Sequence, residues 1–407
     1  MNFELKAPAT QYGLVTLSYW AFTLSDGALR MLVVLFFHQL GYSPIEIAGL
    51  LVLYELCGVI TNLYGGWLAT SIGLTITMQA GLALQIVALS MLMVDSSILN
   101  VVYVMIAQAL SGIGKDLNKM GAKASIKSLV PADAQGRLYR WIALLTGSKN
   151  VLKGVGFFLG GWLLATVGFQ SAVATMATAL SGVLLLSVLM LDRSMGIAEK
   201  PQPLKHLFSK SSAVNRLSAA RFFLFGSRDI WFVVALPVFL QSQLQWSYVQ
   251  VGSMMATWVM AYGVMQTLAP KVTNTGNGET NITHPSGSTA FKWAALLCLI
   301  PAAIGATLYA AGSDPSLPAI VLVTGLMIFG AFFAVNSSIH SYLIVAYARE
   351  DGTSLDVGFY YMCNAAGRLV GTLLSGLVYQ QFGLTACLLL SSLMLVATAA
   401  ISKKLPA

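Results

Sequence analysis

Charged residues lie inside stretches of this sequence that are otherwise apolar. In SYWAFTLSDGALRMLVVLFFHQLGY (residues 18–42), Asp26 and Arg30 interrupt an apolar segment long enough to cross a membrane. The same spacing of four residues separates Lys149 from Lys153 in another apolar segment. Residues four apart lie on one face of an α-helix, so each pair presents its charges in one direction.

A charged side chain at the centre of a membrane helix costs about 2.5–3.5 kcal/mol, so we expect these groups to face water or one another. Basic groups outnumber acidic ones, and surplus positive charge in a low dielectric favours an anion. Guanidinium and ammonium groups suit phosphate and carboxylate oxygens. We therefore predict that a small polyanion is bound by Arg30, Lys149, Lys153, Arg228, Arg368, Asn118, Asn336, His340 and Asn364.

Three acidic residues in the apolar segments are candidates for proton coupling, with Asp26 first, Asp229 second and Glu55 third. The spacing predicts an ion pair between Asp26 and Arg30. Protonation of Asp26 would then free Arg30 to bind the anion. The structural alternative is that this pair only stabilises its own helix.

Other charged residues lie nearer the predicted helix ends. Lys115, Asp116, Lys119 and Arg221 are expected to extend toward the membrane surface rather than into a cavity.

Enzyme and metal-binding motifs are absent from the sequence. The four cysteines are scattered, without a CxxC pair or a Cys/His cluster, and no HExxH or GxSxG motif occurs. We therefore expect neither catalytic residues, nor a metal, nor a cofactor.

The composition is that of a membrane protein, with 57% hydrophobic and 9% charged residues and a mean hydropathy of +0.76. Soluble domains carry about 25% charged residues. A window of about 20 apolar residues therefore predicts an all-α integral membrane protein with twelve transmembrane helices. The segments are 14–38, 44–69, 75–94, 98–118, 139–166, 169–191, 217–241, 247–269, 291–311, 318–346, 357–380 and 383–402.

Lysines and arginines between the segments predict the orientation. They occur in alternate loops and in the C-terminal tail, at Lys123, Lys127, Arg137, Arg193, Lys200, Lys205, Lys210, Lys271, Arg349, Lys403 and Lys404. Because basic loops stay on the cytoplasmic side, both termini are expected in the cytoplasm. The net charge of +8 is then a topology signal rather than a nucleic-acid interface.

A polar, basic stretch at 192–216 divides the segments into six and six. We predict an N-terminal six-helix bundle at 1–191 and a C-terminal one at 217–407. The halves also share residues at offsets of about 203–204, 215 and 218 residues, including Asp26 with Asp229 and Lys153 with Arg368. Such pairs favour a duplicated six-helix unit.

Twelve segments in two parallel halves resemble the major facilitator superfamily. The resemblance implies two bundles around a central cavity that opens to alternate sides of the membrane. GGWLATSIGLT (65–75) keeps the glycines of the family's loop signature, through Gly66 and Gly73. Thr70 and Ser71 stand where the family usually has an acid and an arginine, so no conventional gating latch is predicted there.

The stretches YWAFTLSDGALRMLVVLFFHQLGYSP, GKDLNKMGAKASIKSLVP and GRLYRWIALLTGSKNVLKGVGFFLGG resemble the ArsJ-type organoarsenical efflux permeases. The resemblance implies export of 1-arseno-3-phosphoglycerate through a bacterial inner membrane, with arsenate resistance as the result. It also implies a functional partnership with the glyceraldehyde-3-phosphate dehydrogenase that makes this compound. Proton antiport is the expected driving force. The alternative is transport of another organophosphate or of a carboxylated organic anion.

Overall fold

The computed structural model describes residues 8–129, 135–192, 211–273, 285–310, 316–348 and 353–406. In these ranges the regular elements are all α-helices. They are α2 (Pro8–Gln39), α3 (Pro44–Leu50), α4 (Val52–Ile72), α5 (Leu74–Met91), α6 (Val101–Leu129), α7 (Gln135–Met190), α8 (Ser212–Phe232), α9 (Ala235–Ser242), α10 (Tyr248–Thr273), α11 (Gly287–Ala310), α12 (Ser316–Tyr347) and α13 (Thr353–Ser402). The predicted all-α fold is confirmed.

Two of these helices contain a sharp break. α7 is interrupted at Gly168 and α13 at Gly383, both with φ of 77°. Glycine adopts this conformation without the steric cost that a Cβ would impose. We divide α7 and α13 at these glycines and count α3–α4 and α8–α9 as one membrane crossing each. The helices then fit the twelve predicted segments.

Among the described residues, eight helical stretches are long and apolar enough to cross a membrane by themselves. Two of them, Ser148–Met190 and Asp356–Ser402, contain the glycine breaks. The helices α6 and α10 are not among the eight, because polar residues such as Lys115 in α6 and Gln266 in α10 lower their hydropathy.

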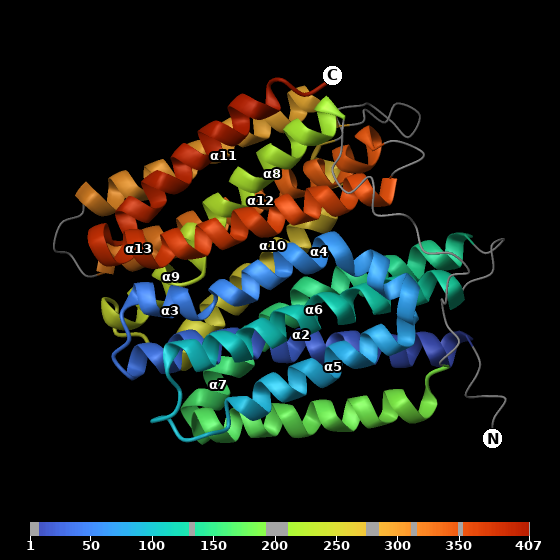
Figure 1. Cartoon of the computed structure of the whole chain (residues 1–407). Helices are drawn as coiled ribbons and strands as arrows, with labels where there is room; N and C mark the ends of the chain where they lie inside the picture. Colours follow the sequence, from blue (N-terminus) through green and yellow to red (C-terminus); the bar gives the residue numbers. More distant parts are fainter. Residues whose placement is uncertain are drawn as a thin grey trace.

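The helices form two groups that lie against each other (Figure 1). In one group α2 packs on α7 and α5 on α6, and in the other α8 and α11 pack on α13. The groups meet where α4 contacts α13 and where α7 contacts α10. The domain limits at 1–191 and 217–407 stay a prediction, and most of 192–216 lies outside the described residues.

The two groups repeat a local cap at corresponding positions. The backbone N–H of Ser43 donates to Glu46 Oε2, and the N–H of Ser247 donates to Gln250 Oε1, both at 2.8 Å. Each pair satisfies backbone donors at the start of a helix. The offset between Ser43 and Ser247 in the sequence therefore corresponds to two copies of the same turn.

The start of α2 and the end of α13 lie at one end of the bundle, which we call the terminal end (Figure 1).

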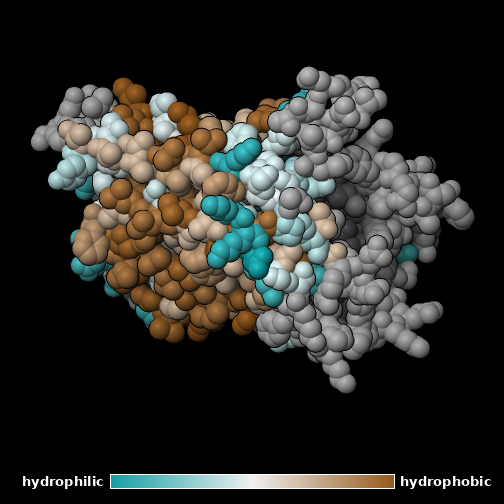
Figure 2. Space-filling view, turned by 90° about the horizontal axis from the view of Figure 1, so that it is seen from above, coloured by the Kyte–Doolittle hydropathy of each residue, from teal (hydrophilic) through white to brown (hydrophobic). Residues whose placement is uncertain are grey.

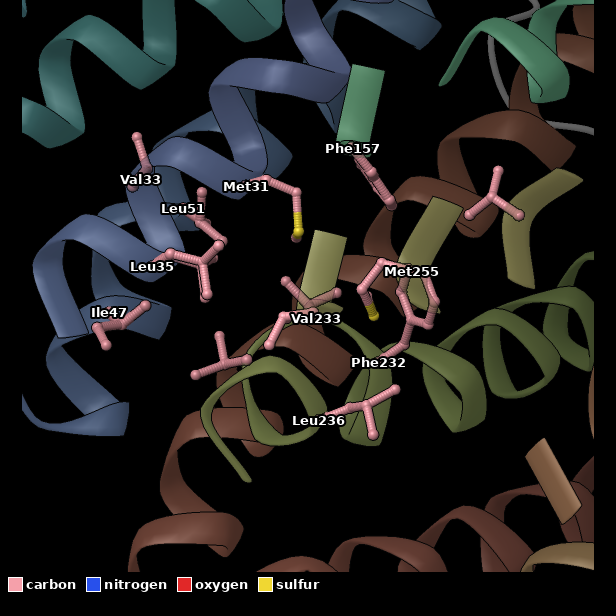
Figure 3. Close-up of a cluster of buried hydrophobic side chains, with 14 of the residues drawn as sticks. Met31, Val33, Leu35, Ile47, Leu51, Phe157, Phe232, Val233, Leu236 and Met255 are labelled. Atoms are coloured by element: carbon pink, nitrogen blue, oxygen red, sulfur yellow. The ribbon is translucent and has the colours of Figure 1, made fainter. Parts of the chain in front are cut away.

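Beyond the middle of the bundle, away from this end, buried apolar side chains from both groups meet (Figure 3). This apolar layer comprises Met31, Leu35, Leu51, Phe157, Phe232, Val233, Leu236 and Met255. The ring centroids of Phe157 and Phe232 are 6.2 Å apart across the layer.

Much of the outer surface is hydrophobic, as the view from above shows (Figure 2). Large apolar side chains such as Leu189, Leu299 and Leu393 are exposed on different helices. In water so much exposed apolar surface would be unfavourable, whereas lipid tails solvate it. The surface therefore agrees with a multi-pass membrane protein.

Candidate anion-binding cavity

A cavity of about 280 Å³ lies between the two groups of helices. Its walls come from α2, α4, α6, α7 and α8 and from α10, α12 and α13. The charged side chains on these walls are Lys115, Lys119, Lys149, Lys153, Arg221, Arg228 and Arg368, against the carboxylates Asp26, Glu55 and Asp116. The lining therefore carries an excess of positive charge.

The apolar layer closes this cavity on the side away from the terminal end. On α2 the lining residue Asp26 is followed by Met31, which belongs to the layer. On α7 Lys153 is followed by Phe157, one helical turn further along. Because both helices run away from the terminal end, the charged cavity lies on the terminal side of the layer.

A chain of ion pairs crosses the inner part of the cavity. Glu55 Oε1 accepts hydrogen bonds from Arg30 Nη2 at 2.8 Å and from Arg368 Nη2 at 2.6 Å. Arg368 Nε also donates to Asp229 Oδ2 at 3.2 Å, and Arg228 Nε donates to Asp229 Oδ1 at 2.6 Å. Three guanidinium groups thus share two buried carboxylates, which leaves a local surplus of one positive charge.

The predicted ion pair between Asp26 and Arg30 is wrong. Asp26 Oδ1 instead accepts a hydrogen bond of 2.5 Å from the Tyr54 hydroxyl. Arg30 turns to Glu55, which approaches it from α4. The spacing on α2 is as predicted, but neighbouring helices supply better-placed partners for both side chains.

The structure brings together most of the predicted site residues. The cavity is lined by Lys149, Lys153, Arg228, Arg368, Asn118, Asn364, Asp26 and Glu55. Arg30 and Asp229 are not on its surface but bind side chains that are.

Asn336 and His340 do not line the cavity and are fully buried in α12. Their side-chain polar atoms have no hydrogen-bond partner among the described residues. The neighbouring Ser337 and Ser341 line the cavity instead. Successive residues point about 100° apart around a helix. Asn336 and His340, which directly precede the two serines, therefore face away from the cavity.

Two ammonium groups on the cavity wall form no salt bridge with an acidic side chain in the described part of the chain. Lys115 Nζ lies 4.0 Å from the centroid of the Tyr54 ring. Lys153 Nζ lies 5.5 Å from the centroid of the Phe157 ring. Ring faces attract a cation but do not neutralise it, so both lysines contribute net positive charge to the cavity.

The residues expected at the membrane surface lie in the cavity instead. Asp116 accepts hydrogen bonds from Lys119 at 3.0 Å and from Thr61 at 2.9 Å, and it is 1% exposed. Arg221 is also buried and lines the cavity. Lys115 and Lys119 are four residues apart and therefore share one face of α6, and this face borders the cavity.

A row of neutral polar side chains crosses between the groups on another wall. Asn150 Nδ2 on α7 donates to Gln266 Oε1 on α10 at 2.7 Å. Gln266 Nε2 donates to the Tyr262 hydroxyl at 2.7 Å, and this hydroxyl donates to Ser337 Oγ at 3.2 Å. The cavity therefore offers both charged groups and neutral hydrogen-bonding groups to a ligand.

A comparison with protein families matches residues 15–291 to the Major Facilitator Superfamily. The match covers more than half of the chain. The chain belongs to the major facilitator superfamily. A comparison with curated protein sequences finds no match.

Solved transporter structures share the fold of this superfamily member. A POT family transporter in complex with 5-aminolevulinic acid has a TM-score of 0.75 at 13% identity, covering 96% of this chain and 94% of its own. A bacterial homolog of the human lysosomal transporter Spinster, in an inward-facing and occupied conformation, has a TM-score of 0.74 at 12% identity, covering 97% and 96%. The human organic anion transporter MFSD10 (TETRAN) has a TM-score of 0.64 at 16% identity, covering 99% and 100%.

These identities are low, so the likeness to solved structures concerns the fold. Together with superfamily membership it points to a transporter rather than an enzyme.

Proposed function

We propose that this superfamily member is a secondary active transporter of a small organic polyanion, which it carries by alternating access to the central cavity. The observation that carries the proposal is the surplus of positive charge on the cavity wall, where Lys115 and Lys153 form no salt bridge with the described residues. A cavity with this charge in a low dielectric attracts anions and repels cations.

The proposed substrate is 1-arseno-3-phosphoglycerate, from the resemblance to the ArsJ-type permeases. Its arsenate and phosphate groups would meet the lysines and arginines of the cavity. A carrier of trivalent arsenic would be expected to use thiolates, whereas none of the four cysteines lines the cavity. In this proposal the protein works in a bacterial inner membrane with both termini in the cytoplasm. It confers arsenate resistance together with a glyceraldehyde-3-phosphate dehydrogenase.

The second candidate substrate is another organophosphate or a carboxylated organic anion. The same charges favour it, and one similar structure is that of an organic anion transporter. The two substrates differ in whether arsenate resistance depends on the protein.

Proton antiport would drive export in this proposal, with Asp26, Asp229 and Glu55 as the candidate proton sites. The geometry now favours Glu55 as the first of these. Its Oε1 binds arginines from both groups of helices, while its buried Oε2 has no partner among the described residues. A proton on Glu55 would weaken its bond to Arg368 Nη2 and make this nitrogen available to an anion, while Arg368 Nε stays bound to Asp229.

Flux of labelled substrate into everted membrane vesicles tests the proposal. We expect uptake to require a proton gradient and to be lost in Lys153→Gln and Arg368→Gln. Lys271→Gln, at an exposed position on α10 outside the cavity, is the matched control and should transport normally. Normal flux in both cavity variants would contradict the anion site.

A deletion strain distinguishes the two substrates. Arsenical export predicts that arsenate resistance requires both this protein and the dehydrogenase. Resistance that is unchanged by the deletion, with uptake of an organophosphate by vesicles, would favour the second candidate.

A further inference from the structure

Arg221 is a buried arginine on α8 that the cavity reaches but that no carboxylate neutralises among the described residues. Its side chain is 4% exposed and lines the cavity. The other cavity arginine on this helix, Arg228, is bound to Asp229. A buried cation without a counter-ion is unfavourable unless a ligand supplies the negative charge.

Neutral groups hold the Arg221 guanidinium in a defined position. Its Nε donates to Asn364 Oδ1 at 3.1 Å, and its Nη1 donates to the carbonyl oxygen of Ser337 at 3.0 Å. Its central carbon lies 4.0 Å from the centroid of the Phe225 ring. The remaining nitrogen, Nη2, has no partner in the described part of the chain, so donors remain for an anion.

The same phenylalanine also contacts Arg228. The guanidinium carbon of Arg228 lies 4.9 Å from the centroid of the Phe225 ring. Because both guanidinium carbons contact the same ring, the carbons of Arg221 and Arg228 are at most about 9 Å apart, the sum of the two distances. The two Cα atoms are seven residues apart, or about 10 Å along the axis of α8. Phe225 therefore contacts two cationic groups on one wall of the cavity.

Arg221 is not required by the repeated architecture. The offset that relates Asp26 to Asp229 relates Ser18 to Arg221, so the first half has a small neutral residue at this position. Ser18 is buried in α2, as Arg221 is in α8. A charge present in only one of two equivalent helices indicates a role in binding rather than in building the fold.

We propose that Arg221 forms a second anion subsite, so that the cavity selects a linear substrate with an anionic group at each end. One end binds Arg221 and the other binds at Arg228, while a chain of about three carbons passes over Phe225. Tyr262 and Gln266, which line the cavity beside Ser337, supply neutral groups for hydroxyl or ester oxygens. This inference rests on the proposed function and narrows its substrate class to bis-anions.

Equilibrium binding to the purified full-length protein tests the subsite with two probes of equal chain length. 3-Phosphoglycerate carries an anionic group at both ends, and glycerol 3-phosphate carries one at a single end. We expect wild type to bind 3-phosphoglycerate at least tenfold more tightly. Arg221→Gln should weaken binding of 3-phosphoglycerate about tenfold or more and change that of glycerol 3-phosphate less than about twofold.

The controls separate a lost subsite from a damaged fold. Arg216→Gln, on the same helix but bound to the carbonyl oxygen of Lys404, should leave both affinities unchanged. Arg221→Lys, which keeps the charge, should retain part of the preference for the bis-anion. On wild type, a series of α,ω-dicarboxylates should bind best near the length of 3-phosphoglycerate.

Two results would overturn the inference. Equal weakening of both probes in Arg221→Gln, with no length optimum on wild type, would make Arg221 a structural residue and leave the proposed function intact. Wild-type protein that binds neither probe would contradict the proposed function and this inference with it.

Discussion

Glu55 on α4 and Arg368 on α13 form an ion pair of 2.6 Å between the two groups of helices. They are 313 residues apart in the sequence. Glu55 is 1% exposed and also binds Arg30, so its carboxylate joins α2, α4 and α13 at one point. Removal of Glu55 leaves the buried Arg30 without a carboxylate partner among the described residues, whereas removal of Arg368 leaves Glu55 paired with Arg30 and Asp229 paired with Arg228.

We therefore expect Glu55→Gln to lower the free energy of unfolding by about 3–5 kcal/mol, and Arg368→Gln to lower it by less. The double variant should lose clearly less than the two single losses combined, because each single variant already removes the interaction between Glu55 and Arg368. Thermal unfolding of the purified proteins in detergent measures all four forms. If the loss in the double variant equals the sum of the two single losses, the Glu55–Arg368 pair does not stabilise the contact between the two groups of helices.

Gly376 lies where α13 approaches α3, at the end of the bundle beyond the apolar layer. A Cβ there would lie 2.5 Å from the carbonyl oxygen of Pro44 and from Ala48 Cβ. Gly376→Ala should therefore force the groups apart, destabilise the protein by about 1–3 kcal/mol and reduce transport. Gly182→Ala is the matched control, because a Cβ at this exposed position of α7 meets no atom within 4 Å. If both variants behave alike, the close approach is unimportant.

Gly168 and Gly383 share a backbone conformation, with φ of 77° and ψ of 176° and −176°. A Cβ at either position meets no neighbouring atom within 4 Å. Alanine should therefore act through backbone strain alone and destabilise by about 1–3 kcal/mol at each site. Gly13→Ala, in regular helix with equal space around it, should be neutral or stabilising. Melting curves that show a loss at only one of the two breaks would argue against their equivalence.

Lys153 allows stability and binding to be separated. A charged group at a helix centre costs about 2.5–3.5 kcal/mol, and this lysine has no acidic partner among the described residues. Lys153→Met should thus raise the unfolding temperature, by an amount corresponding to about 1–3 kcal/mol, while anion binding falls. A lysine with a structural role would give the opposite change in stability. Binding of glycerol 3-phosphate and thermal unfolding, measured on the same preparation, distinguish these outcomes.

Hydropathy predicted most of the fold because lipid imposes it. Every membrane crossing needs a long apolar helix, so the breaks at Gly168 and Gly383 and the turns at Gly41 and Gly73 mark where crossings end. The position of each helix relative to the others depends on side-chain packing, which hydropathy alone does not describe.

The residue types of the site were predicted better than their partners. Charges in apolar segments indicated which helices line the cavity, since such charges must avoid lipid. Spacing along one helix then suggested Asp26 as the partner of Arg30, whereas Glu55 and Tyr54 compete from α4. Contacts between helices decide such pairings. Arg221 was missed because it lies near the start of a predicted segment, where a basic side chain can reach the membrane surface.

The apolar layer has a consequence for the energy supply of the cell. Its side chains offer no hydrogen-bonding groups, so water molecules cannot form a continuous wire past Phe157 and Phe232. Among the described residues, the side chains of this layer therefore offer protons no hydrogen-bonded path between the charged cavity and the far side. The protein can stay in the membrane between transport cycles without short-circuiting the gradient that would drive it.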